Sequence, residues 1–410
     1  MDENQKLCEI VKYAYQKSSL YRSILERNKE MDLNNWDTIP IITKNMIQES
    51  YESIYSVEYM IPTRYEMVLH MFTSGSTGKV LEVLWEQNDF KKSLLPLWIY
   101  RKKYYGIKPD DKMCYFYSIR QFGGEEIEYE EKATSLGFSK CALDEKKIIE
   151  VYEKIYEYDP IWLLLQPSMA IQMISIAKKY SLPKLRSVQY IELSGEMLFE
   201  STRKEITGFF GCTICNQYGS HEVNSIAYEC SCGNLHCLSS NVKVEIINQG
   251  KVVENGEEGE IVVTSLHNHA TPFIRYNTED RGAVYHNVQC KCGNPNPVLK
   301  LSSGRSNDMI INKDGTRISA YVFARAVESI NAIAGNIINQ FQIIQNDFNR
   351  FTVKMAIKDK EDIEEILNMF PRFILHPSLA NAHYEFEFYD TLLLSENNGK
   401  LLYFKNLMIQ

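Results

Sequence analysis

The sequence has no run of about 18 apolar residues, the length that a membrane-spanning helix needs, so we expect no membrane span. Its first residues, MDENQKLCEI, begin acidic and lack the apolar core of a signal peptide. Basic residues are not in excess, since 45 Lys and Arg stand against 53 Asp and Glu and the net charge is −8. Because general nucleic-acid binding requires a basic face, that function is disfavoured. These absences predict a cytoplasmic protein with no membrane or nucleic-acid partner.

A Walker phosphate loop is also absent. That motif reads Gly-x-x-x-x-Gly-Lys-Ser/Thr, whereas in TSGSTGKV, residues 73–80, the glycines are too close together and valine follows Lys79. The stretch still offers main-chain N–H groups, hydroxyls and one cation, which can surround phosphate oxygens. Taken alone it is better explained as a polar turn between strands, so other segments must decide its role.

The middle of the chain alternates between strand and helix patterns. Its 410 residues allow two or three domains with a sizeable core. A first helix is expected over residues 7–26, and a loop from Pro40 onward. The alternation that follows favours an α/β fold with parallel strands. Strands are expected at residues 80–87, 112–118, 161–168 and 187–196, and helices at 148–158, 169–180 and 199–211.

The pattern changes after residue 240. Residues 242–266 place apolar residues at alternate positions between glycine-containing turns, which predicts a small antiparallel β unit. From about residue 305 the chain predicts an α+β module in the order strand, helix, two strands, helix, strand. The polar start of that module is expected to act as a hinge.

Ligands of parallel sheets gather where the strands end. Three polar loops follow expected strands, at residues 166–168, 194–196 and 217–222. We therefore expect these loops to contribute to a binding site.

Five of the ten cysteines fall in two tight clusters, at residues 230–237 and 290–292. In a reducing compartment, clustered cysteines indicate metal binding more than disulfides. Each cluster contains Cys-x-Cys, which is shorter than the common Cys-x-x-Cys and is only suggestive alone. Reduced thiols without a ligand are the alternative interpretation.

Six motifs, in order, resemble those of the adenylate-forming (acyl/aryl-CoA synthetase) superfamily, and within it the phenylacetate–CoA ligase branch. A single motif would be a weak signal, but their joint order is specific. The N-terminal segment with IPIITK at 39–44 also fits, so the resemblance covers essentially the whole chain. The motifs are TSGSTGKV (73–80, phosphate loop), SGE (194–196, adenine side), YGSHE (218–222), RYNTEDR (275–281), GRSNDMI (304–310, hinge) and NNGK (397–400, lysine motif).

The resemblance implies a large N-terminal AMP-binding domain, residues 1–304, with parallel β-sheets, helices and a small β unit at about 240–300. A small, mobile α+β C-terminal domain, residues 305–410, would follow it. The implied cofactors are ATP and Mg²⁺, with a structural Zn²⁺.

The resemblance also assigns roles to single residues. Lys400 would neutralise charge between the attacking carboxylate and the α-phosphate, and Glu222 would bind Mg²⁺, which prefers oxygen ligands. Tyr218 would stack on adenine, and Asp280 would hold the ribose hydroxyls. The implied ATP- or AMP-binding residues are Thr73, Ser74, Gly75, Ser76, Thr77, Gly78, Lys79, Gly195, Glu196, Gln217, Tyr218, Gly219, Ser220, Asp280 and Arg305.

Four positions depart from the family's pattern. His221 replaces the usual threonine, Val80 replaces the usual proline, Glu279 replaces a glycine, and Asn307 falls on the hinge aspartate. The His221 imidazole can still donate to a phosphate oxygen, so we count it as catalytic with Glu222 and Lys400. None of these changes removes a charge that adenylation needs.

The cysteine clusters resemble the structural zinc site of some ligases in this branch. A closed tetrahedral site needs four nitrogen or sulfur ligands. The favoured ligands are Cys230, His236, Cys290 and Cys292, with Cys232 as the chief substitute.

The acyl pocket implied by the resemblance includes Phe122, Gly123, Gln166 and Ser194. The glycine leaves room for a flat ring, and no pair of basic residues is present for a second carboxylate. An aromatic acid, such as a hydroxybenzoate, is therefore expected rather than a long fatty acid.

The predicted function is ATP-dependent activation of a small carboxylic acid as acyl-AMP, with release of pyrophosphate and transfer to a pantetheine thiol of CoA or of a carrier protein. One alternative passes the adenylate to an amine. Another is a non-catalytic nucleotide-binding protein of the same fold. A zinc-ribbon interaction protein would explain the cysteines but none of the other motifs.

Overall fold

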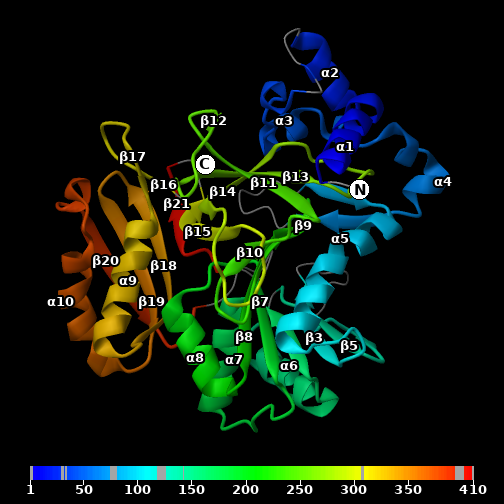
Figure 1. Ribbon diagram of the computed structural model, residues 1–410. Coiled ribbons are helices and arrows are strands. Elements are labelled where there is room, and N and C mark those ends of the chain that lie inside the picture. Colours follow the sequence, from blue (N-terminus) through cyan, green and yellow to red (C-terminus); the bar gives the residue numbers. More distant parts are fainter. Residues whose placement is uncertain are drawn as a thin grey trace. The chain divides into compact units, whose positions relative to one another are not determined.

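The computed structural model describes residues 3–28, 32, 35–73, 81–117, 126–141, 143–305, 309–392 and 401–408, and Figure 1 labels its elements. The chain forms two compact units, and each unit combines two separate segments. Unit 1 consists of Met1–Pro109 and Gln217–Ser302, and unit 2 of Asp110–Asn216 and Ser303–Gln410.

Two helices replace the single N-terminal helix that the sequence predicts in unit 1. Ser18 separates α1 (Glu3–Lys17) from α2 (Ser19–Arg27) and adopts an extended conformation. Its hydroxyl donates to the Ser53 carbonyl, so a contact distant in sequence breaks the helix. The loop predicted after Pro40 extends only to Thr43, which caps α3 (Lys44–Glu49) by accepting from the Met46 N–H.

Unit 1 contains a β-hairpin and an antiparallel sheet besides its helices. The hairpin pairs β1 (Leu69–Phe72) with β2 (Glu82–Trp85), and the sheet has the order β12-β11-β13-β14-β15-β10-β9-β8 within this unit. The antiparallel β unit predicted at 242–266 is confirmed by the pairing of β11 and β13. The remaining elements are α4 (Pro62–Tyr65), α5 (Gln87–Tyr100), a π-helical turn (Arg101–Tyr105), β8 (Thr213–Ser220), β9 (Asn224–Glu229), β10 (Leu235–Cys237), β11 (Val242–Asn248), β12 (Lys251–Val252), β13 (Gly259–Ser265), β14 (Tyr276–Tyr285) and β15 (Val298–Arg305).

Unit 2 contains the parallel sheet that the sequence predicts. Its strands have the order β7-β6-β3-β5-β4, with β7, β6, β3 and β5 parallel and β4 antiparallel at the edge. Apolar residues of α6 and α7 pack on the strands in one buried cluster, and Figure 1 shows these helices beside the strands. The bounds are β3 (Met113–Tyr117), β4 (Tyr129–Lys132), β5 (Ser135–Ser139), α6 (Glu145–Tyr158), β6 (Trp162–Leu165), α7 (Pro167–Lys179), β7 (Tyr190–Ser194) and α8 (Glu200–Phe210).

The C-terminal part of unit 2 is an α+β module, as the sequence predicts, but with more strands than expected. A hairpin of two strands, β16 and β17, replaces the expected first strand. The sheet β20-β19-β18-β21 also contains one strand more than the sequence predicts, β21, which runs parallel to β18. The bounds are β16 (Met309–Ile311), β17 (Arg317–Ser319), α9 (Tyr321–Ala334), β18 (Ile338–Asp347), β19 (Arg350–Ile357), α10 (Ile363–Phe373), β20 (His383–Tyr389) and β21 (Phe404–Asn406).

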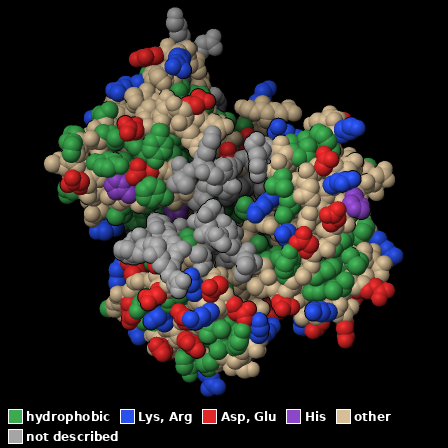
Figure 2. Space-filling model, turned by 180° about the vertical axis from the view of Figure 1, so that it is seen from behind, with side chains coloured by type: hydrophobic (Ala, Val, Ile, Leu, Met, Phe, Trp, Pro, Cys, Tyr) green, Lys and Arg blue, Asp and Glu red, His purple; other side chains and the backbone are tan. Residues whose placement is uncertain are grey.

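The surface carries both signs of charge. Figure 2 shows lysine and arginine interspersed with aspartate and glutamate over the described part of the face in view. This mixture agrees with the lack of an excess of basic residues in the sequence. Among the described residues, no helix combines the length and the apolar character that crossing a bilayer requires.

Candidate active site and metal centre

The β1–β2 hairpin carries the predicted phosphate loop at its tip. Thr73 closes the base of that loop, because its N–H donates to the Leu81 carbonyl at 2.9 Å and its Oγ1 accepts from the Leu81 N–H at 2.9 Å. Both residues are buried. Thr73 thus anchors the loop, a role that the sequence does not reveal. The other predicted loop residues, Ser74, Gly75, Ser76, Thr77, Gly78 and Lys79, lie outside the described residues.

The QYGSHE loop begins as the end of β8, opposite β9. Gly219 is required there, since a Cβ on it would lie 2.5 Å from the Asn224 carbonyl oxygen. Gln217 donates from its side chain to the Ser225 hydroxyl at 2.8 Å, so it braces the two strands. The buried hydroxyl of Ser220 has no hydrogen-bond partner among the described residues.

Asp280 and Tyr218 come together across this unit. The Tyr218 hydroxyl donates to Asp280 Oδ2 at 2.8 Å and lies 3.5 Å from Thr278 Oγ1. Thr278 in turn accepts from the Asp280 N–H and donates to the Ile261 carbonyl. The residues predicted to hold adenine and ribose are therefore neighbours in one hydrogen-bonded group.

Glu222 is a second carboxylate of unit 1 and is 8% exposed. Its Oε1 accepts from the Tyr276 hydroxyl at 3.1 Å. Burial, and then the nearby Glu222 carboxylate, raise the pKa of Tyr276 well above its ordinary value, so the phenol stays a donor. The sequence pattern contains Tyr276 but does not show this pairing. His221, next to Glu222, is exposed, and its carbonyl accepts from the Trp85 indole N–H at 3.0 Å.

Glu279 stands where the family's motif has glycine, and its φ is 64°. This is the left-handed region that glycine adopts without strain and that other residues adopt at a cost. The substitution therefore keeps the turn that presents Asp280 but places a side chain in an unfavourable backbone conformation.

Arg275, which begins the RYNTEDR motif, is structural. It is buried, and its guanidinium forms an ion pair with buried Glu245 at 3.2 Å. Trp36 donates from its indole to the same carboxylate at 2.8 Å. Ile42, in the IPIITK segment, pairs with Tyr276 as an isolated β-bridge. The N-terminal segment thus supports the strand that carries Tyr276 and Asp280.

Unit 2 contributes the predicted adenine-side and acyl-side loops. Gly195, with φ 82°, makes the turn after β7 and Ser194. The Glu196 carboxylate accepts from the N–H and the hydroxyl of Ser168, at 3.0 and 2.8 Å, in the first turn of α7. Gln166 is the N-cap residue of α7, and its buried Oε1 has no partner within the described residues.

Some predicted site residues are not among the described residues, and one is described only in its main chain. Phe122, Gly123, Asn307 and Lys400 lie outside the described residues. Arg305 ends β15, and only its main chain is described.

The four favoured metal ligands converge in unit 1. Cys230, His236, Cys290 and Cys292 place their ligand atoms within 4.8 Å of one another. Cys230 follows β9, His236 lies on β10, and both other cysteines lie between β14 and β15. All ten cysteines are unbridged. Cys232 is exposed and does not belong to this group, so the structure gives no support to it as a substitute ligand.

The spacing of the group fits a tetrahedral metal. With Zn–S bonds of about 2.3 Å and Zn–N bonds of about 2.0 Å, two sulfurs lie about 3.8 Å apart and a sulfur and a nitrogen about 3.5 Å apart. The Sγ atoms of Cys230 and Cys290 are 3.7 Å apart, and Cys292 Sγ is 3.4 Å from His236 Nε2. The His236 Nδ1–H donates to the Asn296 carbonyl at 2.9 Å, which leaves Nε2 as the ligand atom.

The charge of the group also suits a dication. Burial would raise the pKa of Cys290, but hydrogen bonds from the Cys292 main chain, His236 and Asn234 outweigh it and lower that pKa to about 5. Burial raises the pKa of Cys230 to about 12. Without a metal the group therefore favours one thiolate beside a neutral thiol, whereas a bound dication would stabilise several thiolates.

Both cysteine turns share a Cys-x-Cys-Gly pattern. Gly233 and Gly293 have φ values of 79° and 72°, and each donates its N–H to the carbonyl of the first cysteine of its turn. This shared glycine is a signal of paired turns that the spacing of the cysteines alone does not give.

The end of α5 and the π-helical turn support the metal centre, which sequence reasoning missed. The Tyr104 hydroxyl lies 3.8 Å from Cys292 Sγ, and Tyr105 donates to the Glu229 carbonyl at 2.8 Å. Tyr100 accepts from the Asn296 side chain at 3.1 Å. The tyrosine-rich run at residues 100–105 is the only sequence signal of this contact.

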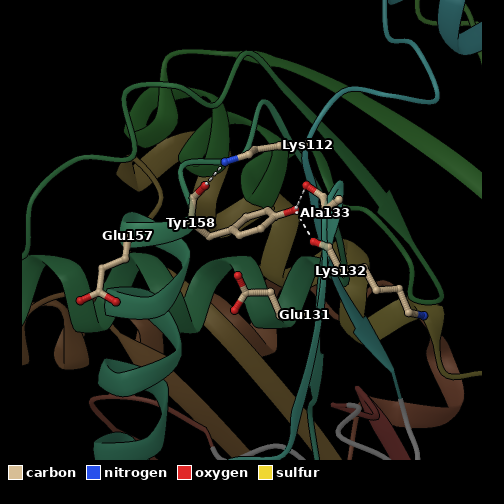
Figure 3. Close-up of a pocket in the computed structure, with 6 residues that line it drawn as sticks. All are labelled: Lys112, Glu131, Lys132, Ala133, Glu157 and Tyr158. Carbon is tan, nitrogen blue, oxygen red and sulfur yellow. Dashed lines mark hydrogen bonds between the residues drawn. The ribbon is translucent and has the colours of Figure 1, made fainter.

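A pocket of about 470 Å³ in unit 2 contains none of the predicted site residues. As Figure 3 shows, Lys112 donates to the Tyr158 carbonyl, and the Tyr158 hydroxyl donates to the Lys132 and Ala133 carbonyls. The pocket lies before β3 and β5, whereas ligands of parallel strands gather beyond their carboxyl ends. We assign it no part in the chemistry.

Comparison with known proteins identifies the family. A family model described as AMP-binding enzyme matches residues 34–269, and one described as CapK C-terminal domain matches residues 310–406. Protein CapK of Staphylococcus aureus is 22% identical over 405 residues, which cover 94% of this chain and 84% of that protein. Phenylacetate-coenzyme A ligase of Thermus thermophilus is 23% identical over 362 residues, which cover 83% of this chain and 77% of that protein.

A solved structure shares the fold. The structure of 2-hydroxyisobutyryl-CoA ligase in the postadenylation state superposes with a TM-score of 0.77 at 15% identity, covering 99% of this chain and 89% of that one. The chain belongs to the AMP-binding enzyme family, in which its relatives include phenylacetate–CoA ligases. It is an adenylate-forming enzyme of the ligase class, as its motifs predict.

Proposed function

We propose that this protein activates a small aromatic carboxylic acid with ATP in the cytoplasm and transfers the acyl group to a pantetheine thiol. The observation that carries this proposal is the pair of carboxylates in unit 1, Asp280 held by Tyr218 and Glu222 held by Tyr276. Each carboxylate is oriented by a tyrosine hydroxyl, as expected of groups that must meet a ligand in a fixed geometry.

The two carboxylates suit different parts of the nucleotide. Asp280 is half-buried and would accept hydrogen bonds from the ribose hydroxyls. Glu222 keeps Oε2 as an oxygen ligand for Mg²⁺, while Tyr276 occupies Oε1. When bound, Mg²⁺ would supply positive charge that stabilises the phosphate oxygens of ATP.

The proposed reaction has two steps. A carboxylate oxygen of the acid attacks the α-phosphorus, the bond to the bridging oxygen breaks, and pyrophosphate leaves with its electron pair. In the second step a thiol, losing its proton, attacks the acyl carbon and releases AMP. Because the charge is spread over phosphate oxygens, positioning and electrostatic stabilisation dominate the first step, and Lys400 is the residue we assign to it.

We propose that the metal centre binds structural Zn²⁺. A closed set of three sulfurs and one nitrogen leaves no position for substrate, so the ion would hold the two cysteine turns together. It would also fix the tyrosines at the end of α5 relative to β9 and the loop before β15.

The aromatic nature of the acid is supported by the relatives that are named phenylacetate–CoA ligases. Gln166, which follows β6, and Ser194, which ends the parallel neighbour β7, would offer polar contacts to a hydroxyl on the ring. We further propose that residues 305–410 form the small domain that brings in Lys400, because the CapK C-terminal model covers 310–406.

ATP–pyrophosphate exchange over a panel of aromatic and aliphatic acids tests the proposal. Exchange should depend on one class of added acid and fall at least a hundredfold in Lys400→Ala, by loss of transition-state charge stabilisation, about 3 kcal/mol or more. Lys405→Ala, a change at an exposed lysine of β21, is the matched control and should keep full activity. Absence of exchange with every acid, in folded and zinc-loaded protein, would refute the proposal.

The acceptor is tested separately. With the labelled acid and ATP, thioester should form with CoA or with a carrier protein bearing pantetheine. Formation of an amide with an amine, and of no thioester, would replace the second step by amine acylation and leave the first step intact.

A further inference from the structure

Residues 90–109 form a local basic segment in a chain with an excess of acid. They contain six basic residues and no acidic residue, whereas the net charge of the chain is −8. They cover most of α5 and the π-helical turn that follows it. Arg101 is buried and lies over the Trp98 ring, but the five lysines of the segment are exposed. Their charges therefore face the solvent.

Four of these lysines share one helix face with two exposed apolar side chains. Leu95 and Ile99 are 58% and 53% exposed and lie four residues apart, so they are neighbours on the surface of α5. The lysines stand before and after them at helical spacing, over about 18 Å along the axis. We call this set the α5 face, and its members are Lys91, Lys92, Leu95, Ile99, Lys102 and Lys103.

Most charges of the α5 face are not neutralised within the described part of the chain. Lys92 forms an ion pair with Asp89 at 3.2 Å. Lys91 and Lys102 form no ion pair with any described residue. A partner with opposite charge would be steered to such a face, and burial of the two apolar side chains would add to its affinity.

The opposite face of α5 contacts the candidate active site. Ser93 is fully buried, and its Oγ accepts from the Asn224 side chain at 2.6 Å. Asn224 begins β9, which lies beside α5 (Figure 1), two residues after Glu222. Trp85, just before the helix, donates to the His221 carbonyl. A partner on the α5 face would therefore lie about 10 Å, one helix diameter, from the turn that carries Glu222.

The size and charge of the face indicate the kind of partner. Its lysines are spread over about 18 Å, which is more than one phosphate group of a small molecule can contact. Nucleic acid is disfavoured by the net charge of −8. A bilayer is disfavoured because the face has only two aliphatic side chains to insert. An acidic protein surface matches both the lysines and the apolar pair, and a small interface suits a partner that must dock and leave.

We propose that the α5 face is the docking surface for an acidic carrier protein, which bears the pantetheine thiol that accepts the acyl group. This inference rests on the proposed function, and it selects a carrier protein over free CoA as the acceptor. Leu95 and Ile99 pack against the carrier protein, while the lysines pair with its carboxylates. The attack on ATP does not use this face.

The first test compares a protein acceptor with a small one. In the double variant Lys91→Glu, Lys102→Glu, the kcat/KM for transfer to an acidic carrier protein loaded with pantetheine should fall about tenfold or more, since like charges oppose docking. The loss should appear mainly in the KM for the carrier protein. ATP–pyrophosphate exchange and transfer to CoA should stay within about twofold of the wild type. An equal loss with CoA would overturn the docking role.

A matched double variant controls for net charge. Lys146→Glu, Lys251→Glu makes the same change of charge at exposed lysines of α6 and β12 and should leave transfer to the carrier protein unaltered. An equal loss in this control would mean that net charge, and not the α5 face, governs transfer. Leu95→Ser keeps the charge and should still lower the kcat/KM about threefold. Melting temperatures within about 3 °C of the wild type would show that the variants fold.

Direct binding separates the remaining outcomes. Calorimetry should show weaker binding of the carrier protein to the double variant Lys91→Glu, Lys102→Glu than to the wild type, and equal affinities would overturn the inference. Vesicles of anionic phospholipid that bind the wild type but not this variant, with transfer to the carrier protein unaffected, would assign the face to a membrane.

The two proposals fail in different ways. A wild type that supports exchange and acylates CoA but no carrier protein would overturn the docking surface and leave the proposed function intact. A wild type without exchange for any acid would refute the proposed function, and calorimetry with the carrier protein would still test the α5 face.

Discussion

The hydroxyl of Tyr218 donates to Asp280 Oδ2 at 2.8 Å, across 62 positions of sequence. Two residues that the motifs assign to adenine and to ribose are thereby linked directly. The arrangement fixes the carboxylate and the aromatic ring relative to each other, and it allows the two roles of Tyr218 to be separated by mutation.

Tyr218→Phe keeps the ring and removes the donor. We expect the free energy of unfolding to fall by about 1–2 kcal/mol, because a hydrogen bond to a charged group is lost, and the KM for ATP to rise less than tenfold. Tyr218→Ala should raise that KM further, because the stacking surface is lost as well. Urea unfolding and exchange kinetics measure the two effects, with Tyr156→Phe, at an exposed tyrosine, as the control. Equal losses of affinity in Tyr218→Phe and Tyr218→Ala would contradict the stacking role.

Thr73→Val should loosen the base of the phosphate-binding loop. The change leaves the buried Leu81 N–H without its acceptor, which costs about 1–3 kcal/mol of stability. Thr73→Ser keeps the hydroxyl and should stay within about 1 kcal/mol of the wild type. Chemical denaturation compares the three proteins. Equal stability of the Val and Ser variants would show that the hydroxyl does not close the loop.

Glu279→Gly should be more stable than Glu279→Ala. Both variants lose the carboxylate, but only glycine relieves the left-handed backbone at φ 64°. The relief is partly offset by the greater freedom of glycine in the unfolded chain, so we expect a difference of roughly 0.5–1 kcal/mol. Thermal unfolding of the two variants under identical conditions measures the sign of this difference in stability. A more stable alanine variant would mean that the backbone relaxes at this position.

The metal centre predicts a specific pattern of metal loss. Elemental analysis should find about one zinc per chain in the wild type, and little in Cys290→Ser or Cys230→Ser. Cys232→Ser should retain zinc, because Cys232 is exposed and outside the group of four. A strong chelator should lower the melting temperature of the wild type, since binding energy is lost from the folded state. Loss of zinc in Cys232→Ser would require a different ligand set.

Acid should weaken the pair that buried Asp89 forms with partly exposed His269 in unit 1. Burial would raise the pKa of Asp89, but hydrogen bonding to His269, at 2.7 Å, and to Lys92 overcomes it and lowers that pKa below the usual 3.8. The carboxylate therefore stabilises the fold above the unfolded pKa, and this contribution is lost as the pH falls through the lower folded value.

Asp89→Asn removes that contribution. The gap in free energy of unfolding between wild type and variant should be widest near neutral pH and should shrink below about pH 4. Urea titrations across this range measure it. Lys92→Met, at an exposed partner, should change stability by less than about 1 kcal/mol. A gap that widens toward acid would contradict the lowered pKa.

The parallel sheet of unit 2 could be predicted because its signals are local. Strand β6 and helix α7 follow each other directly, and each buries a continuous apolar set that is visible in the sequence. The break at Ser18 could not be predicted, since the pattern from Leu7 continues through it and the cause is a contact with Ser53.

In the candidate site, too, local sequence motifs could be recognised, whereas contacts between distant parts of the chain could not be predicted. Motif order identified Glu222 and Asp280, each of which the structure pairs with a tyrosine hydroxyl, and the cysteine clusters identified the four candidate metal ligands, which the structure brings together. The partners that orient them, such as Tyr276 for Glu222, depend on the pairing of strands far apart in the chain. A sequence motif can contain such residues, but it does not show which side chain each of them contacts by a hydrogen bond.

Unit 1 consists of two segments that are far apart in the chain, so it cannot complete its core until the second segment has been synthesised. Its core joins Trp85, from the first segment, to Phe273, from the second, in one apolar cluster. On a ribosome that adds roughly 5–20 residues per second, the first segment emerges about ten to forty seconds before its partner is complete. During that interval its apolar side chains have no native cover. A nascent chain of this enzyme should therefore need chaperones early, and fragments that stop before Ser302 should aggregate rather than fold.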